Sequence, residues 1–196
     1  MTGFDLIIVG VGGQGAILAS DIVGKAAVHA GLPVMSAETH GMAQRGGSVE
    51  NHVRLDCRYG SLIPRGRADA VLALEPAEAL RAVDYLSPDG VAVVNTNPVL
   101  PITVLSGSAD YPAVDDMVKE LGGRCKRLVA VDADALATQA GHPLTANVVM
   151  IGAVSGFLPL DVHSLEDSIR SLVPPKTVDV NLAAFRLGRK AAETTD

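Results

Sequence analysis

Short apolar runs alternate along the chain with longer segments whose apolar residues recur at helical spacing. The apolar runs are bounded by Gly, Pro or charged residues and predict buried strands at residues 6–9, 33–37, 70–74, 91–94 and 128–131. The longer segments predict helices at residues 16–30, 76–85, 117–121 and 134–140. Strands that alternate with helices favour a parallel sheet covered on both faces. The pattern therefore predicts an α/β fold: a Rossmann-like three-layer α/β/α domain with a mostly parallel sheet.

The last third of the chain is dominated by helical patterns. Residues 145–158 are apolar nearly all round, so a helix there should be buried, and its Asn147 needs a hydrogen-bond partner. Two further helices are expected at residues 164–173 and 177–190. The apolar run 148–160 also predicts an interface, since large apolar patches mark association sites. Because no repeat or linker interrupts the pattern, we expect one domain over residues 1–196.

Composition narrows the classes of protein. Sixteen Lys and Arg against twenty-two Asp and Glu give a net charge of −6, which argues against a nucleic-acid partner. The longest apolar stretch, residues 146–160, is shorter than the roughly 20 residues that cross a bilayer. Asp5 stands before the first apolar run, unlike in a signal peptide. We therefore expect a cytoplasmic protein with no membrane association.

A glycine-rich turn follows the first predicted strand and opens the first helix. It reads Gly10-Val11-Gly12-Gly13-Gln14-Gly15 and fits the pattern G-x-G-x-x-G. Glycines permit a tight turn there, and the helix N-terminus offers free N–H groups to an anion. An acidic residue about 20 positions on completes a dinucleotide fingerprint, and Glu38 lies a little beyond that place. Two interpretations stay open: an NAD(P) site, and a structural turn that binds no nucleotide.

A polar, glycine-rich loop follows the second predicted strand, at the edge of the sheet where ligands usually bind. Its candidate residues are Glu38, His40, Gln44, Arg45, Gly46 and Gly47. Arg45 could bind an anion such as a carboxylate, because its planar guanidinium group needs unhindered access and the neighbouring glycines provide it. It could equally pair with charged side chains on another chain. Glu38, His40 and His52 would allow acid–base chemistry, whereas their spacing is not that of a metal site. Substrate or coenzyme binding and interface formation both stay open.

These two motifs together, with His52-Val53-Arg54, resemble the gamma-type subunit of 2-oxoacid:ferredoxin oxidoreductases, and within that family the small (beta) subunit of the indolepyruvate type. The resemblance spans almost the whole chain. Its further stretches are residues 61–64, 68–70, 74–76, 78–81, 94–96, 173–177 and 181–185.

The resemblance implies a subunit of an enzyme that decarboxylates a 2-oxoacid such as indolepyruvate, forms acyl-CoA from coenzyme A and reduces ferredoxin. It also implies that a large (alpha) partner subunit carries thiamine diphosphate, Mg²⁺ and the [4Fe–4S] clusters. The composition agrees, because two cysteines without a C-x-x-C motif cannot ligate such a cluster. No catalytic residue is therefore expected on this chain alone, and it should be inactive by itself.

Three alternatives remain. The substrate could be pyruvate, 2-oxoisovalerate or 2-oxoglutarate, the chain could be a stand-alone NAD(P)-binding protein, or it could be a purely structural oligomer. Cys125 lies between Arg124 and Lys126, whose charges could lower the pKa of its thiol, but Cys57 and Cys125 are expected to be incidental.

Overall fold

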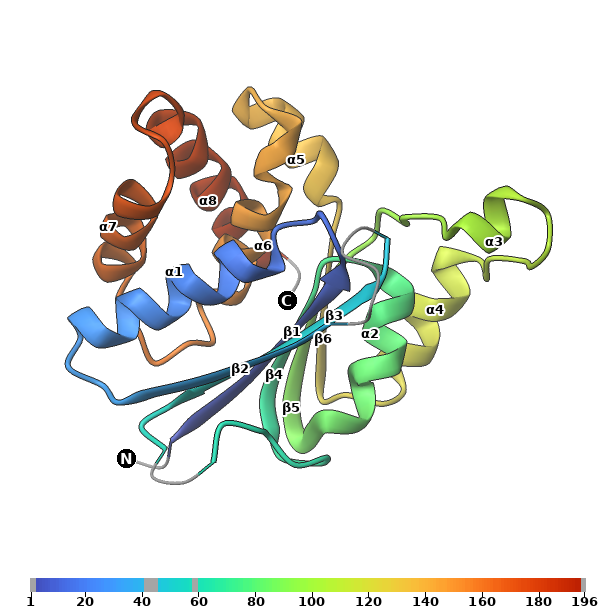
Figure 1. Cartoon of the computed structure of the whole chain (residues 1–196), viewed down its shortest axis with the longest axis horizontal. Coiled ribbons are helices and arrows are strands. Elements are labelled where there is room, and N and C mark those ends of the chain that lie inside the picture. The colour runs from blue at the N-terminus through green and yellow to red at the C-terminus, as the bar shows by residue number, and fades with distance from the viewer. Residues whose placement is uncertain (1–2, 41–45, 58–59, 195–196) are drawn as a thin grey trace.

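A computed structural model describes residues 3–40, 46–57 and 60–194 and shows a six-stranded sheet between two layers of helices (Figure 1). This confirms the predicted three-layer α/β/α fold. The strands are β1 (Phe4–Val11), β2 (Val34–His40), β3 (Ser48–Leu55), β4 (Ala68–Ala73), β5 (Leu86–Asn95) and β6 (Arg127–Val131). Five of them overlap the apolar runs that predicted strands, whereas β3 contains none of these runs.

The strand order is β2-β3-β1-β4-β5-β6. Strands β1, β4, β5 and β6 pair in parallel, as predicted. Strand β3 lies between β2 and β1 and is antiparallel to both. Strand β2 therefore runs in the same direction as β1 without touching it. The end of β2, where the polar loop begins, therefore lies at the carboxyl edge of the sheet, as expected.

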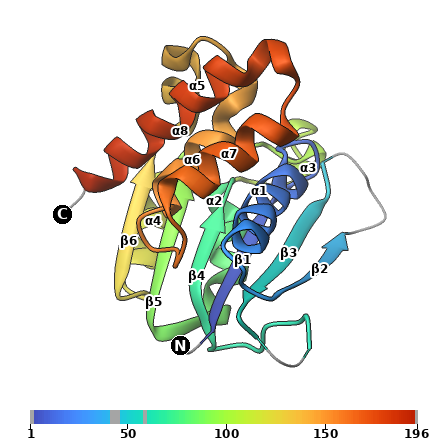
Figure 2. The ribbon, with the colours of Figure 1, turned by 90° about the vertical axis from the view of Figure 1, so that its left-hand side faces the viewer.

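One face of the sheet carries the larger layer of helices (Figure 2). It consists of α1 (Ala16–His29), α5 (Ala133–Ala140), α6 (Ala146–Val154), α7 (Val162–Leu172) and α8 (Val178–Glu193), with the short 3-10 helices η2 (Pro143–Thr145) and η3 (Pro175–Thr177). These helices and the inward side of β1, β3 and β4 form the main apolar core. Asp161 caps α7, because its carboxylate accepts a hydrogen bond from Ser164 N at 2.8 Å.

Helix α6 lies at the centre of this layer. The residues from Val148 to Val154 are buried, as predicted from an apolar run with no polar face. Its closest neighbour is α8, which crosses it at backbone contact: a Cβ atom added at Gly188 would lie 1.8 Å from Val149 O. The interface predicted from residues 148–160 is therefore wrong for this helix, because other parts of the same chain cover it.

The other face carries α2 (Pro76–Ala82), the 3-10 helix η1 (Val83–Tyr85) and α4 (Val114–Gly122). Helix α2 begins as predicted, with Pro76 in its first turn and the Glu75 carboxylate as its N-cap. Residues 98–112 join β5 to α4 and contain a single helical turn, α3 (Ile102–Leu105), which the sequence pattern did not predict. We call residues 98–112 the arm, because Figure 1 shows α3 projecting away from the sheet.

None of the helices in the part of the chain that the structure describes combines the length and the hydropathy that a membrane-spanning helix requires.

Candidate functional site

The two glycine-rich segments meet at the carboxyl edge of the sheet. Gly12 N donates a hydrogen bond to Gly47 O at 2.8 Å, and Gly46 N donates to Gly12 O at 3.2 Å. Strand pairing leads into this contact, since Val11 lies opposite Ser48. The structure therefore brings the turn at residues 10–15 together with the end of the polar loop, which the sequence placed only at the same edge.

The side chain of Gln14 holds the glycine turn together. Its Oε1 accepts a hydrogen bond from Val11 N, and its Nε2 donates to Leu74 O, both at 2.8 Å. The amide thus ties the end of β1 to the residue that follows β4. Both ends of this side chain are used inside the protein, so Gln14 supports the turn rather than reaching a ligand.

Asn147 fixes the turn from the side of α6. Its Nδ2 donates to Gly15 O at 3.2 Å, which supplies the partner that a buried amide requires. Gly15 has φ 81°, in the left-handed region, and a Cβ atom there would lie 2.4 Å from Asn147 Nδ2. Only glycine fits this position without strain and collision.

The N-terminus of α1 offers uncapped amides. No side chain accepts a hydrogen bond at its N-cap, and its first turn contains no acidic residue. The first N–H groups of a helix lack partners within the helix and attract anionic groups. With Gly13 exposed beside it, this end of the turn can approach a carboxylate or a phosphate.

Glu38 does not occupy the position that a dinucleotide site requires. It lies on β2, and β3 separates β2 from β1. With adjacent strands about 4.8 Å apart, Glu38 is about 10 Å from β1 across the sheet. In dinucleotide-binding domains the second strand lies directly beside the first. The interposed strand therefore removes the acidic part of the NAD(P) fingerprint.

Glu38 and His52 lie on opposite faces of the sheet. Glu38 pairs with Asn51, whose Nδ2 reaches Ser20 Oγ on α1 at 3.3 Å, so both lie on the α1 face. His52, the next residue, contacts the other layer, where its Nδ1 accepts from Ile63 N at 3.0 Å. Acid–base or metal chemistry by these two residues together is therefore ruled out, and no cluster of three potential ligands occurs among the described residues.

The remaining candidates of the polar loop are only partly placed. His40 ends β2, so its backbone lies at the carboxyl edge. Gln44 and Arg45 lie outside the described residues.

Two buried carboxylates beside this contact were missed as site residues. Glu75 is 1% exposed and lies two residues after the end of β4. Its Oε2 caps α2 by accepting from Glu78 N at 2.9 Å, and its Oε1 accepts from Tyr111 OH and from Val99 N. Burial and the Glu75 hydrogen bond raise the pKa of Tyr111 far above its ordinary value. One carboxylate therefore joins β4, α2 and both ends of the arm.

Glu78 is the second, at 4% exposure. Its Oε2 accepts from Ser48 Oγ at 2.6 Å, and its Oε1 pairs with Arg81. Ser48 immediately follows the contact between the glycine segments, so Glu78 couples that contact to α2. The run Leu74-Glu75-Pro76 carried a usable signal: an acidic residue between a buried strand and a helix-starting proline is placed to cap the helix.

A cavity of about 640 Å³ opens between the arm and α2. Its polar lining includes Ser48, Glu75, Glu78 and Arg81, and the arm contributes both apolar residues such as Val99 and Ile102 and polar ones such as Asp110 and Tyr111.

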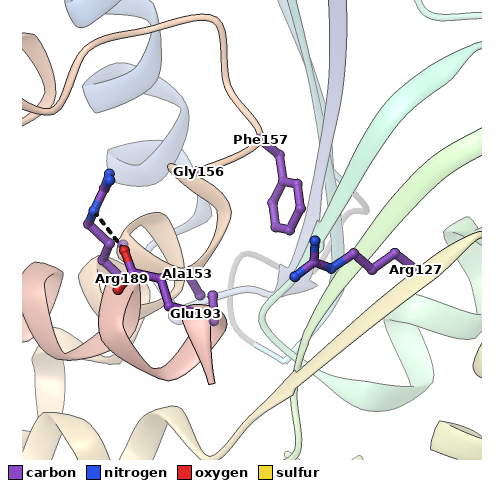
Figure 3. Close-up of a pocket in the computed structure, with 8 residues that line it drawn as sticks. Arg127, Ala153, Gly156, Phe157, Arg189 and Glu193 are labelled. Atoms are coloured by element: carbon purple, nitrogen blue, oxygen red, sulfur yellow. Dashed lines mark ion pairs between the residues drawn. The ribbon is translucent and has the colours of Figure 1, made fainter. Parts of the chain in front are cut away.

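A smaller cavity of about 210 Å³ lies away from this edge, beside α6 and α8 (Figure 3). Arg127, at the start of β6, stacks over the Phe157 ring at 5.0 Å from its centre, and Arg189 pairs with Glu193 at 3.4 Å. None of the sequence candidates lines it.

The residues of this chain do not fit the cofactors that the resemblance implies. Cys57 follows β3 and Cys125 precedes β6, so three strands, or about 19 Å, separate them, and a [4Fe–4S] cluster takes four ligands. A Mg²⁺ site that serves thiamine diphosphate needs an acidic residue close to an amide; here Asp89 and Asn95 are six residues apart on β5, about 20 Å, too far to share one ion. Burial raises the pKa of the Cys125 thiol, so its basic neighbours do not produce a net lowering.

Comparison with known proteins places the chain in one family. The family model for pyruvate ferredoxin/flavodoxin oxidoreductase matches residues 5–191. The indolepyruvate oxidoreductase subunit IorB of Thermococcus kodakarensis is 45% identical and covers 98% of each chain, and that of Archaeoglobus fulgidus is 44% identical over 96% of this chain and 94% of its own. The crystal structure of the keto/oxoacid ferredoxin oxidoreductase gamma subunit from Geobacter sulfurreducens superimposes with a TM-score of 0.71 at 25% identity, covering 97% of this chain and 99% of its own.

Proposed function

The chain belongs to the pyruvate ferredoxin/flavodoxin oxidoreductase family, and from that premise we propose that it is the small subunit of an indolepyruvate-type 2-oxoacid:ferredoxin oxidoreductase. The observation that carries this proposal is the 44–45% identity to indolepyruvate oxidoreductase subunits along nearly their whole length. The substrate is then an aryl 2-oxoacid, converted with coenzyme A to an acyl-CoA, CO₂ and reduced ferredoxin.

The site favours a supporting role in this reaction. The polar side chains around the glycine turn are hydrogen-bonded within the chain, namely those of Gln14, Asn147, Glu75 and Glu78. Covalent chemistry needs a nucleophile or base that can reach the reacting atoms. We therefore assign thiamine diphosphate, Mg²⁺ and the clusters to a large partner subunit, where they supply decarboxylation and electron transfer.

The contribution of this chain is binding and positioning at the carboxyl edge. The uncapped N-terminus of α1, next to Gly13, suits an anionic group such as the carboxylate of the 2-oxoacid or a phosphate of coenzyme A. The turn is held at three points, by Gln14, by Asn147 and by the hydrogen bonds to residues 46 and 47. A fixed turn keeps its amides aimed at one place, so little ordering is needed when the anion arrives.

The test is reconstitution with the large subunit. We expect the complex to reduce ferredoxin with indolepyruvate and coenzyme A, and each subunit alone to be inactive. Pyruvate, 2-oxoisovalerate and 2-oxoglutarate, compared by kcat/KM, determine the substrate class. Full activity of either subunit alone would disprove the proposal.

A second measurement separates the proposal from a stand-alone NAD(P) protein. Calorimetric titration of the isolated chain with NADH should show no micromolar binding, because Glu38 is displaced by a whole strand from the position that binds the ribose 2′-hydroxyl. Coenzyme A is titrated in parallel. Tight NAD(P) binding would favour the alternative.

A further inference from the structure

The arm is the most apolar exposed part of the described chain. Eight large apolar side chains stand out as exposed among the residues described, and the arm supplies four of them. They are Val99 at 39%, Leu100 at 41%, Ile102 at 81% and Leu105 at 70% exposure. Exposed apolar groups gathered in one place mark an association site, whereas scattered ones do not.

The arm is held in position rather than left free. Glu75 accepts a hydrogen bond from Val99 N at 3.4 Å near one end of the arm, and from Tyr111 OH near the other. Because Glu75 is 1% exposed and also caps α2, both ends are anchored to the body of the domain. The tip, α3, is thus presented in one direction (Figure 1). A preorganised apolar tip loses little entropy when it binds.

Two more of the eight exposed apolar residues lie close to the glycine turn. Ile17, 52% exposed, belongs to the first turn of α1, and Leu144, 81% exposed, lies just before α6. Asn147, three residues after Leu144, contacts Gly15. Six of the eight therefore lie along the carboxyl edge, on either side of the candidate site.

The charges around the arm indicate what kind of surface it meets. No Lys or Arg occurs from residue 82 to residue 118, and the arm carries one charge, on Asp110. Asp115 and Asp116 follow at the start of α4 and are exposed. Two copies of this arm would bring these carboxylates together, and like charges facing each other oppose association. A partner with a basic rim fits better.

We propose that the arm inserts into an apolar groove, bordered by Lys and Arg side chains, on the large subunit of the oxidoreductase. This proposal rests on the proposed function, which supplies that partner. Insertion at this edge sets the glycine turn and the cavity behind the arm against the large subunit. The arm would thereby orient the small subunit on the active site.

The test uses the complex made by coexpression. Ile102→Asp with Leu105→Asp places two carboxylates at the tip, and mass photometry of diluted complex measures the Kd. The matched control is Val28→Asp with Leu62→Asp, whose side chains are 62% and 58% exposed but lie away from the carboxyl edge. We expect the arm variant to bind at least about tenfold more weakly, because it loses a central apolar contact. Binding of the control variant should be unchanged. Ile102→Ser with Leu105→Ser, a milder change, repeats the test should the first variant unfold.

Three results would overturn the proposal. The arm and control variants could bind the large subunit equally well, which refutes the arm as the contact while leaving the proposed function intact. The isolated chain could form a dimer that the arm variant abolishes without weakening binding to the large subunit, which assigns the arm to self-association. The wild-type chain could fail to bind the large subunit at all, which removes the proposed function as well.

Discussion

Replacing Gly15 by alanine tests how the glycine turn is held. Alanine at φ 81° costs about 1–2 kcal/mol of stability, because it is strained in the left-handed conformation. About 0.4–1 kcal/mol is regained, because alanine lowers the conformational entropy of the unfolded chain. The new Cβ would lie 2.4 Å from Asn147 Nδ2, so Asn147 must move and lose its bond to Gly15 O. A buried amide left unpaired adds about 1–3 kcal/mol. We expect a total loss of about 3 kcal/mol, combining these contributions.

Thermal and urea unfolding measure this loss. For a chain of this size, about 3 kcal/mol lowers the Tm by roughly 6–12 °C. Gly13→Ala is the matched control: Gly13 also has positive φ, at 107°, but a Cβ atom there meets nothing within 4 Å. It should cost about 1 kcal/mol, since only strain and chain entropy remain.

A double-mutant cycle isolates the contact with Asn147. In an Asn147→Ala background the collision is gone, so Gly15→Ala should cost about as little as Gly13→Ala, near 1 kcal/mol. Additive losses from Gly15→Ala and Asn147→Ala would refute the reasoning, because they would show that the two residues do not interact.

Two further predictions concern the arm and the helical layer. Tyr111→Phe removes the hydrogen bond from the phenol to Glu75 and should speed hydrogen exchange in residues 98–112. Because the fold raises the Tyr111 pKa above 10.0, the stability of the wild-type protein should fall as pH rises past 10, and that of the variant should fall less steeply. Urea titrations at alkaline pH measure both slopes, and equal slopes would contradict the assignment. Gly188→Ala should prevent stable folding, as judged by circular dichroism, because its Cβ would lie 1.8 Å from Val149 O. Gly24→Ala is the control: the nearest atom to its Cβ would be 3.8 Å away, so it should be neutral or stabilising by up to about 1 kcal/mol. Equal stability of the two variants would refute the close crossing of α6 and α8.

Much of the fold was predictable because its signals are local. Buried parallel strands read as unbroken apolar runs, and helix starts were marked by residues such as Pro76. Strand β3 was not predicted from an apolar run because it lies inside the sheet yet carries polar residues: Asn51 and His52 are 0% and 2% exposed. Asn51 Nδ2 bonds Ser20 and His52 Nδ1 accepts from Ile63 N, and both partners lie outside the strand, so the strand's own sequence gives no sign of them.

The site was predictable in location but not in the roles of its residues. Both glycine segments were expected at the carboxyl edge, and the structure joins them through Gly12, Gly46 and Gly47. The sequence could not show that the Gln14 amide bonds the backbone of Leu74, because an amide can form hydrogen bonds equally well with a ligand or with the backbone. The role of Glu75 depends on Tyr111, 36 residues away, and only the three-dimensional fold brings them together.

The covering of α6 by α8 has a consequence for the newly synthesised chain. Residues 148–154 leave the ribosome well before Val178–Glu193, the helix that packs against them. Until α8 has emerged, the most apolar helix lacks its main cover, and exposed apolar segments of that kind aggregate or recruit chaperones. The sheet can pair earlier, because β6 ends at Val131. The yield of folded protein in the cell should therefore depend strongly on α8, although α8 forms no part of the candidate site.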